Sequence, residues 1–178
     1  MSQRIIRREF DQSRAAVADL LQAILVSEMV TPGKRLLLVS PWVSDFPVID
    51  NRSGFFSQLD PRWGASRIRL SSVLRSLMAR GTVVYLALRP DQRENEFVER
   101  LEMAVQADGT EGRLIVRRSE KASVAHEKAL VGDDWALHGS MNFTYSGVEL
   151  NGELITYTTE NETVSELATE LYSMFWNA

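Results

Sequence analysis

Cysteine is absent from this 178-residue sequence, which excludes disulfide bonds, thiolate metal sites and a cysteine nucleophile. Hydrophobic runs are short, and none approaches the roughly 18 residues that a membrane-spanning helix needs. The three arginines within residues 1–8 are not followed by an apolar stretch, so we expect no secretory signal and no stable membrane association. These absences favour a cytoplasmic protein.

Lysine is scarce among the basic residues. Of the 20 lysines and arginines only three are lysines, and the net charge of −4 argues against a protein that coats nucleic acid by bulk charge. Arginine has a planar fork of donors that suits phosphate and carboxylate oxygens. Taken by itself, a codon or surface-composition bias is the better explanation of the arginine excess, so composition alone leaves the function open.

The hydrophobic pattern alternates between helical and strand periods, which predicts an α/β sandwich. We find no internal repeat, and the length fits one domain over residues 1–178. Residues 46–66 have no clear period, and long irregular loops are usually functional or mobile. The expected helices are 13–29, 67–80, 90–106 and 161–176, and the expected strands are 35–39, 82–88, 113–117, 124–131, 135–138 and 153–158.

Two short patterns lie close together in the second half of the chain. H-x-K-x4-D begins at His126, and G-S-x-N begins at Gly139. In a strand, His126 and Lys128 would point to the same face and contact one anionic group together. Ser140 and Asn142 add hydroxyl and amide donors, so the set suits a tetrahedral phosphate. The first pattern alone is expected by chance roughly 0.002 times in a chain of this composition.

These residues resemble the HKD signature of the phospholipase D superfamily. Residues 37–43 resemble the strand and turn near the start of such domains, and Asn151-x-Glu153 resembles the downstream N-x-E motif. The resemblance implies a phospholipase D-like α/β/α sandwich with a central mixed sheet flanked by helices. The spacing before G-S is one residue short, so either Asp133 or Asp134 is the motif aspartate.

The resemblance also implies a mechanism, a metal-independent phosphodiesterase reaction through a covalent phosphohistidine. His126 would attack phosphorus while Glu153 orients its imidazole ring. Lys128 and Asn142, assisted by Ser140, would hold the nonbridging oxygens. Asp133 completes the expected catalytic set, and we expect no cofactor and no metal.

The chain carries one copy of the motif, whereas the chemistry needs a second histidine as general acid and base. His138 has no lysine two residues further on, and we interpret it as a hairpin residue. The second histidine is therefore expected to be His126 of another subunit, in a homodimer whose active site lies on the two-fold axis.

Basic and aromatic residues around the motif suggest substrate contacts. Such residues would bind backbone phosphates or stack on bases. A solvated edge strand with salt bridges to Glu111 and Glu120 is an equally good interpretation of the basic group, and packing is the more common role for Trp42. The proposed substrate-binding residues are Arg113, Arg117, Arg118, Lys121, Ser40 and Trp42; Arg62, Arg67 and Arg69 form a weaker second group, and Trp63 is a second candidate for stacking.

A nuclease that cleaves DNA or RNA is the leading hypothesis, since small single-motif members resemble nucleases and accessory components of DNA-modification and phage-defence clusters. A phospholipase D-type lipid phosphodiesterase is the alternative enzyme. A non-catalytic nucleic-acid-binding or scaffold subunit of a larger DNA-processing or defence complex is the third hypothesis. Such a scaffold has no need for His126, Lys128, Asn142 and Glu153 together.

Overall fold

A computed structural model describes residues 3–7, 14–90, 92–119 and 126–176. Helices and strands alternate along most of the chain, as the periodicity predicts. In chain order the elements are β1 (Gln3–Arg7), α1 (Arg14–Val30), β2 (Arg35–Val39), β3 (Pro47–Asp50), β4 (Arg67–Arg69), α2 (Leu70–Ala79), β5 (Val83–Leu88), α3 (Gln92–Asp108), η1 (Glu111–Arg113), β6 (Leu114–Arg118), β7 (Ala129–Val131), β8 (Ala136–Gly139), α5 (Tyr145–Glu149), β9 (Leu154–Thr158) and α6 (Asn161–Trp176).

A seven-stranded mixed sheet forms the centre of the fold, in the order β1-β9-β8-β7-β2-β5-β6. Strands β2, β5 and β6 are parallel, whereas β7, β8, β9 and β1 are joined by antiparallel pairings. Because β7 runs antiparallel to β2, Ala129 at the start of β7 pairs with Val39 at the end of β2. The sheet is apolar on both faces at β2, where residues 36–39 are fully buried, as a central strand requires.

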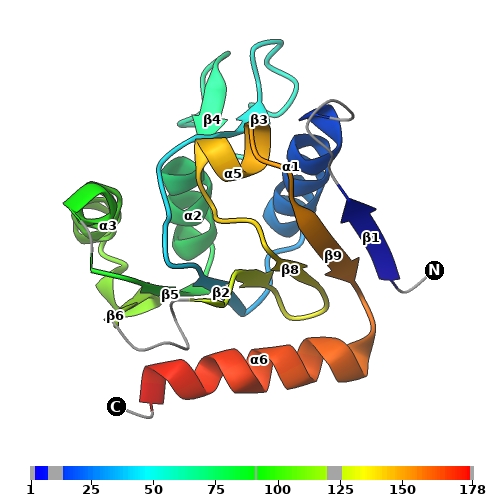
Figure 1. The fold of residues 1–178 in the computed structure, drawn as a ribbon. Coiled ribbons are helices and arrows are strands. Elements are labelled where there is room, and N and C mark those ends of the chain that lie inside the picture. The colour runs from blue at the N-terminus through cyan, green and yellow to red at the C-terminus, as the bar shows by residue number, and fades with distance from the viewer. Residues whose placement is uncertain (1–2, 8–13, 91, 120–125, 177–178) are drawn as a thin grey trace.

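Helices cover both faces of this sheet (Figure 1). Among the described helices α1, α2 and α3 lie on one face, and α6 crosses the other. On α6 the residues Val164, Ala168 and Leu171 recur at helical spacing and pack against Leu37 and Val39 of β2. The predicted α/β/α sandwich with a central mixed sheet is confirmed.

The irregular segment predicted at 46–66 is bounded by a two-stranded sheet, in which β3 pairs antiparallel with β4. Asn51 is fully buried inside the loop. Its Nδ2 donates to the carbonyl of Gly64 (2.9 Å) and to Ser57 Oγ (3.1 Å), while its Oδ1 accepts from the backbone N–H of Phe56 (2.6 Å). One buried amide therefore orders a loop that has no regular period of its own.

Several expected boundaries are wrong, each for a local reason. The helix predicted from residue 67 begins at Leu70, because residues 67–69 pair with β3 as β4. The strand predicted from residue 124 begins only at Ala129, and residues 124 and 125 lie outside the described residues. Strands β1 and β3 and helix α5 were not predicted, since five residues or fewer show too little periodicity.

No helix in the described ranges is long and apolar enough to cross a membrane.

Asp60 joins the loop to the helical layer. Its buried carboxylate accepts hydrogen bonds from the backbone N–H of Arg62 (2.8 Å), from Arg62 Nε (2.9 Å) and from the hydroxyl of Ser76 on α2. Burial raises the pKa of Asp60, but the hydrogen bonds from Arg62 and Ser76 outweigh burial and lower the pKa from 3.8 to about 2.

This pKa predicts how stability depends on pH. The ionised carboxylate of Asp60 stabilises the fold above its unfolded pKa of 3.8, and that stabilisation is lost as the pH falls towards about 2. We expect Asp60→Asn to lower the free energy of unfolding at pH 7 by roughly 2 kcal/mol. The variant should also flatten the dependence on pH between about 4 and 2, measured by urea denaturation across that range. An equally steep dependence in the variant would contradict the assignment, and Asp134→Asn at an exposed turn is the control.

Candidate functional site

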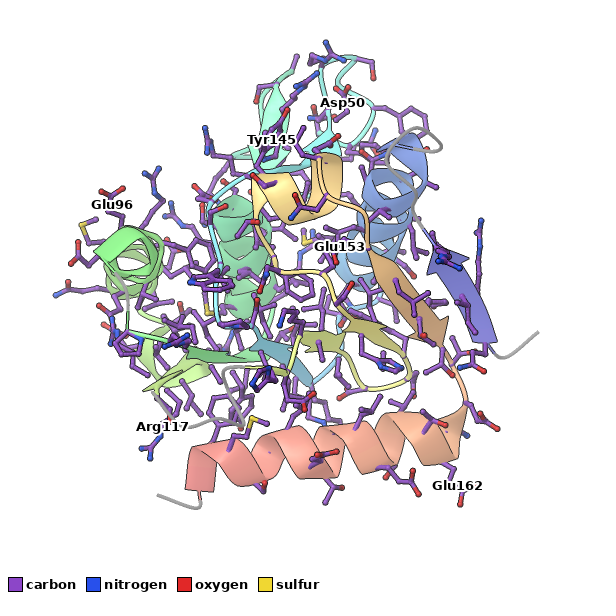
Figure 2. All side chains as sticks on the ribbon, in the orientation of Figure 1. Asp50, Glu96, Arg117, Tyr145, Glu153 and Glu162 are labelled. Atoms are coloured by element: carbon purple, nitrogen blue, oxygen red, sulfur yellow. The ribbon has the colours of Figure 1, made fainter. Side chains whose placement is uncertain are left out.

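Strand direction brings the two sequence patterns to one edge of the sheet. His126 and Lys128 directly precede β7, Ser140 follows β8, and Glu153 directly precedes β9. Since β7, β8 and β9 alternate in direction, the start of β7, the end of β8 and the start of β9 meet at the same edge. This is the edge at which the parallel strands β2, β5 and β6 end. Figure 2 shows Glu153 near the centre of the molecule, at these strand ends.

Lys128 lies against the backbone of His126. Its Nζ donates a hydrogen bond to the carbonyl oxygen of His126 (3.1 Å). The expected reason for their proximity is wrong, because His126 lies in helical backbone ahead of β7 and not within a strand. The His126 side chain is exposed and the Lys128 side chain is half-buried, so both groups are accessible to a ligand.

Gly139 allows β8 and β9 to approach closely at the site. Its N–H donates to the carbonyl of Lys128 (3.1 Å), and its φ of 150° lies in the region that favours glycine. A methyl group at this position would lie 2.1 Å from the carbonyl oxygen of Leu154. Gly139 therefore joins the segment that carries Lys128 to the segment that carries Glu153.

Ser140 holds the carboxylate of Glu153. Its hydroxyl donates to Glu153 Oε2 and accepts from the N–H of Leu154 (3.0 Å), while its own N–H donates to the carbonyl of Leu154 (3.0 Å). Glu153 is only 8% exposed, and a buried carboxylate needs such a donor. Ser140 thus positions Glu153 and is itself occupied by that task.

Ser40 ties the segment after β2 to Asn142. Its fully buried hydroxyl lies 2.8 Å from the carbonyl of Trp42 and 3.3 Å from Asn142 Oδ1, and accepts from the N–H of Phe143 (3.5 Å). The assignment of Ser40 as a substrate-binding residue is therefore wrong, since burial leaves it no access to a ligand. Trp42, in contrast, is 47% exposed, so packing is not its main role.

The sequence of this chain matches a known protein family. Residues 64–176 match the profile of a family described as cardiolipin synthase, PLD-like domain, and the match covers more than half of the chain. The chain belongs to the phospholipase D-like family. No curated protein sequence matches it significantly.

Solved structures resemble the phospholipase D-like chain in fold at low sequence identity. Polyphosphate kinase from Porphyromonas gingivalis aligns with 98% of the chain at 12% identity and a TM-score of 0.63, but the chain spans only 26% of that protein. NucT from Helicobacter pylori (14% identity, TM-score 0.58) aligns over 97% of this chain and 94% of its own. Nuc from Salmonella typhimurium, a phospholipase D family member (12% identity, TM-score 0.57), aligns over 99% and 94%. At this level the likeness shows the fold alone.

Asp133 is the member of the phospholipase D-like motif that the structure does not bring to the others. It lies in the turn after β7, at the opposite end of that strand from Lys128. Its carboxylate accepts from the N–H of Lys34 (2.6 Å) and lies 3.4 Å from Arg35 Nε. Asp134 beside it is exposed. Asp133, and not Asp134, therefore anchors the turn to the start of β2. The expectation that Asp133 belongs to the catalytic set is wrong, because it lies at the far end of β7 and has a structural role there.

The predicted basic group is dispersed. Arg113 lies at the opposite edge of the sheet and donates to the carbonyl of Met78 (2.5 Å), so it does not reach the site. Arg117 and Arg118 lie at the end of β6, on the same edge of the sheet as the candidate site. Figure 2 shows Arg117 on the outside of the molecule, away from Glu153. Three strand spacings, about 14 Å, separate β6 from β7. Lys121 lies outside the described residues.

His138 and Trp63 lie away from the site. His138 pairs with Ala129 and Thr156 within the sheet, on the face that α6 covers. Burial lowers its pKa, and the charge of Glu127 opposes that shift only in part. Trp63 is buried, which excludes the base-stacking role considered for it.

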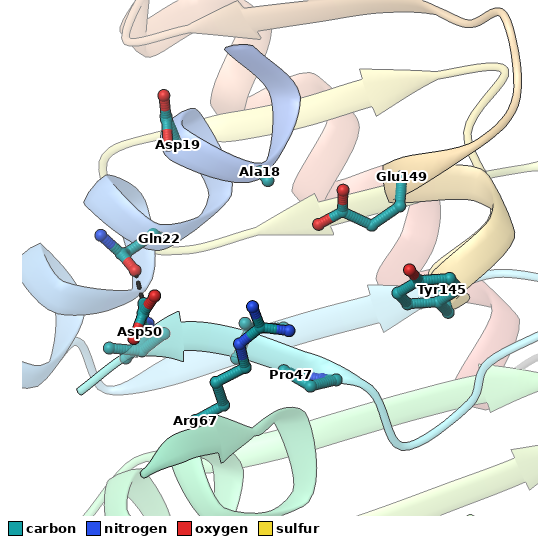
Figure 3. Close-up of a pocket in the computed structure, with 10 residues that line it drawn as sticks. Ala18, Asp19, Gln22, Pro47, Asp50, Arg67, Tyr145 and Glu149 are labelled. Carbon is teal, nitrogen blue, oxygen red and sulfur yellow. Dashed lines mark hydrogen bonds between the residues drawn. The ribbon is translucent and has the colours of Figure 1, made fainter. Parts of the chain in front are cut away.

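A cavity of about 460 Å³ opens beside the site, between α1, the β3–β4 pair and α5 (Figure 3). Among its described lining residues are the acidic Asp19, Asp50 and Glu149 and the basic Arg67. The side-chain hydrogen bond from Arg52 lowers the pKa of Asp50 from 3.8 to about 2, which keeps that carboxylate ionised. Asp19 and the ionised Asp50 would repel a phosphate, so we do not include this cavity in the candidate site.

The described residues hold no cluster of three or more histidine, aspartate or glutamate side chains arranged to bind a metal ion.

Thr144 has a role that was not predicted from the sequence. Its Oγ1 accepts a hydrogen bond from the N–H of Gly147 (3.1 Å) and caps the N-terminus of α5. Its signal was the helix-capping preference of threonine.

We expect Ser140→Ala to lower the free energy of unfolding by about 1–3 kcal/mol, because Glu153 would remain buried without its donor. Urea denaturation measures the loss. Ser146→Ala, at an exposed position of α5, is the matched control and should change the free energy of unfolding by less than about 0.5 kcal/mol. Equal effects of the two substitutions would exclude the supporting role of Ser140.

Gly139→Ala should destabilise the protein by at least about 2 kcal/mol, because the added methyl group meets the Leu154 carbonyl and the backbone has a positive φ. Gly112→Ala is the control, since nothing lies within 4 Å of the added carbon there. Thermal unfolding of both variants measures the difference. A Gly139 variant as stable as the control would disprove the close approach of β8 and β9.

Proposed function

We propose that this phospholipase D-like chain is a phosphodiesterase that cleaves nucleic acid through a phosphohistidine intermediate. The observation that carries the proposal is the convergence of His126, Lys128, Asn142 and the buried carboxylate of Glu153 at one sheet edge. Family membership supports phosphodiesterase-type chemistry. The nucleic-acid substrate, the covalent intermediate and the shared site are the proposal.

In the proposed reaction one ring nitrogen of His126 attacks phosphorus and forms a P–N bond as the bond to the leaving oxygen breaks. His126 of the partner subunit donates a proton to that oxygen. The same partner group then takes a proton from water, whose oxygen attacks phosphorus and releases His126. Glu153 accepts a hydrogen bond from the other ring nitrogen and keeps the attacking nitrogen unprotonated.

Lys128 and Asn142 suit the nonbridging oxygens. The ammonium of Lys128 has three donors, of which one reaches the His126 carbonyl. Asn142 Oδ1 lies 3.3 Å from the Ser40 hydroxyl, and in the proposed reaction its amide N–H groups donate to the phosphate. These donors neutralise charge that develops on the phosphate.

A homodimer supplies the second histidine. The one remaining histidine in the chain, His138, lies on the face that α6 covers. Near the candidate site three large hydrophobic residues are about half exposed, Tyr145, Leu150 and Leu154. Exposed hydrophobic residues of this kind suit a protein interface. A larger DNA-processing or defence complex and a cytoplasmic location stay predictions.

The two histidines provide the test. We expect His126→Ala to reduce cleavage at least about 10³-fold, whereas His138→Gln should retain it within a few-fold. Labelled single-stranded DNA, duplex DNA, RNA and phosphatidylcholine vesicles, each with EDTA, separate nuclease from lipase activity, and light scattering reports the dimer. Undiminished cleavage by the His126 variant would overturn the mechanism, and lipid turnover alone would favour the alternative enzyme. Failure of the wild type to cleave any substrate would favour the scaffold.

A further inference from the structure

Two arginines near the site share one carboxylate. Arg69 ends β4, Arg100 lies on α3, and both face Asp45. Arg69 Nη1 lies 3.9 Å and Arg100 Nε lies 3.6 Å from Asp45 Oδ2, and neither distance is a hydrogen bond. Both guanidinium groups are more than half exposed, at 53% and 59%.

Asp45 is fixed by the helix that follows. Its Oδ1 accepts a hydrogen bond from the N–H of Ser71 in the first turn of α2 (3.0 Å), and its side chain is only 10% exposed. Its Oδ2 is buried and receives no hydrogen bond from the described residues. Arg69 also donates a hydrogen bond to the backbone carbonyl of Asp45, but a carbonyl carries no net charge to neutralise it. Among the described residues two positive charges therefore face one negative charge.

A cavity of about 370 Å³ adjoins the two arginines, between α2 and α3. Ser71 and Ser72 contribute hydroxyl groups, Met103 contributes an exposed apolar side chain, and the described lining includes no acidic residue. Arg75 also lines the cavity, but Asp108 already holds its guanidinium through two hydrogen bonds (2.6 and 2.7 Å). The surplus charge of this cavity therefore comes from Arg69 and Arg100.

The arginine pair lies one chain segment away from the candidate site. Val43 forms a bridge with Phe143, and Ser44 donates to the carbonyl of Phe143 (3.0 Å). Phe143 directly follows Asn142, and Asp45 directly follows Ser44. The segment 42–45 thus connects the neighbourhood of Asn142 to the arginine pair, and Trp42 at its start is exposed.

We propose that Arg69 and Arg100 form a second phosphate subsite, which binds the phosphate of a nucleotide next to the scissile one. The proposal rests on the proposed function and deepens it, because only a substrate with successive phosphates occupies both positions. A nucleic acid strand has one phosphate per nucleotide, and Trp42 can stack on the base between the two phosphates. Contacts to phosphate carry no sequence information, so this subsite supports cleavage without base specificity.

Binding tests the subsite independently of catalysis. In a His126→Ala background, Arg100→Gln and Arg69→Gln should each weaken the affinity for a fluorescein-labelled single-stranded DNA about tenfold. Each should also reduce the slope of the logarithm of the binding constant against the logarithm of the salt concentration by about one. Arg100→Lys should restore much of the salt dependence. Arg52→Gln is the matched control, because Arg52 is equally exposed but already held by Asp50. Thermal unfolding confirms that the variants fold. Arg100 is the safer site, because Arg69 also donates to the backbone carbonyl of Asp45, whereas the Arg100 contact seen among the described residues is the long ion pair.

The outcomes separate the two proposals. Equal affinity and equal salt slope in the Arg100 and Arg52 variants would overturn the subsite, whatever the enzyme does. With active protein, the Arg100 variant should lose turnover of the oligonucleotide but keep that of bis(p-nitrophenyl) phosphate, which has one phosphate. Equal loss on both substrates would assign Arg100 to the fold and not to the subsite. Arginine-dependent binding to cardiolipin vesicles but not to DNA would contradict the substrate class, and no turnover of either substrate by the wild type would contradict the proposed function alone.

Discussion

The antiparallel pairing of β7 with β2 is the constraint on which the candidate site depends. It places the start of one strand beside the end of the other, and the β7–β8–β9 meander then returns the remaining site segments to the same edge. The register is held by burial, since Leu130 packs in the larger core and Ala129 packs on the α6 side. A slip by one residue would exchange these faces. The polar site residues therefore owe their positions to apolar neighbours that take no part in chemistry.

The sequence predicted the regular elements better than the contacts that individual residues make. The buried run of β2 and the helical period of α6 were sufficient signals, because a long period or a fully apolar run reports directly on burial. Spacing did not reveal that Ser40 is a buried tether or that Asp133 anchors the far end of β7. Those roles depend on residues about 100 positions apart, which a local pattern does not contain.

The acidic net charge and the abundance of arginine are compatible once the pairs are considered. Most ion pairs among the described residues hold an arginine within the fold. They join Arg35 to Asp133, Arg52 to Asp50, Arg62 to Asp60 and Asp108, and Arg75 to Asp108. These arginines order loops and helices and are not available to a polyanion. At Asp45 the balance is reversed, with two arginines for one carboxylate. The proposed second phosphate subsite therefore depends on a local excess of positive charge and is compatible with the net charge of −4.

The two proposals together constrain how a substrate crosses the protein. A two-fold axis through a shared site relates each arginine pair to an identical pair on the other side of the scissile phosphate. A strand bound in this way is held on both flanks by contacts to its backbone, which leaves its bases without specific partners. A strand, however, has a direction, whereas the site is symmetric, so the substrate makes unequal contacts with equivalent residues. Either His126 can then act as the nucleophile while the other serves as the acid, and the orientation of the bound strand decides which.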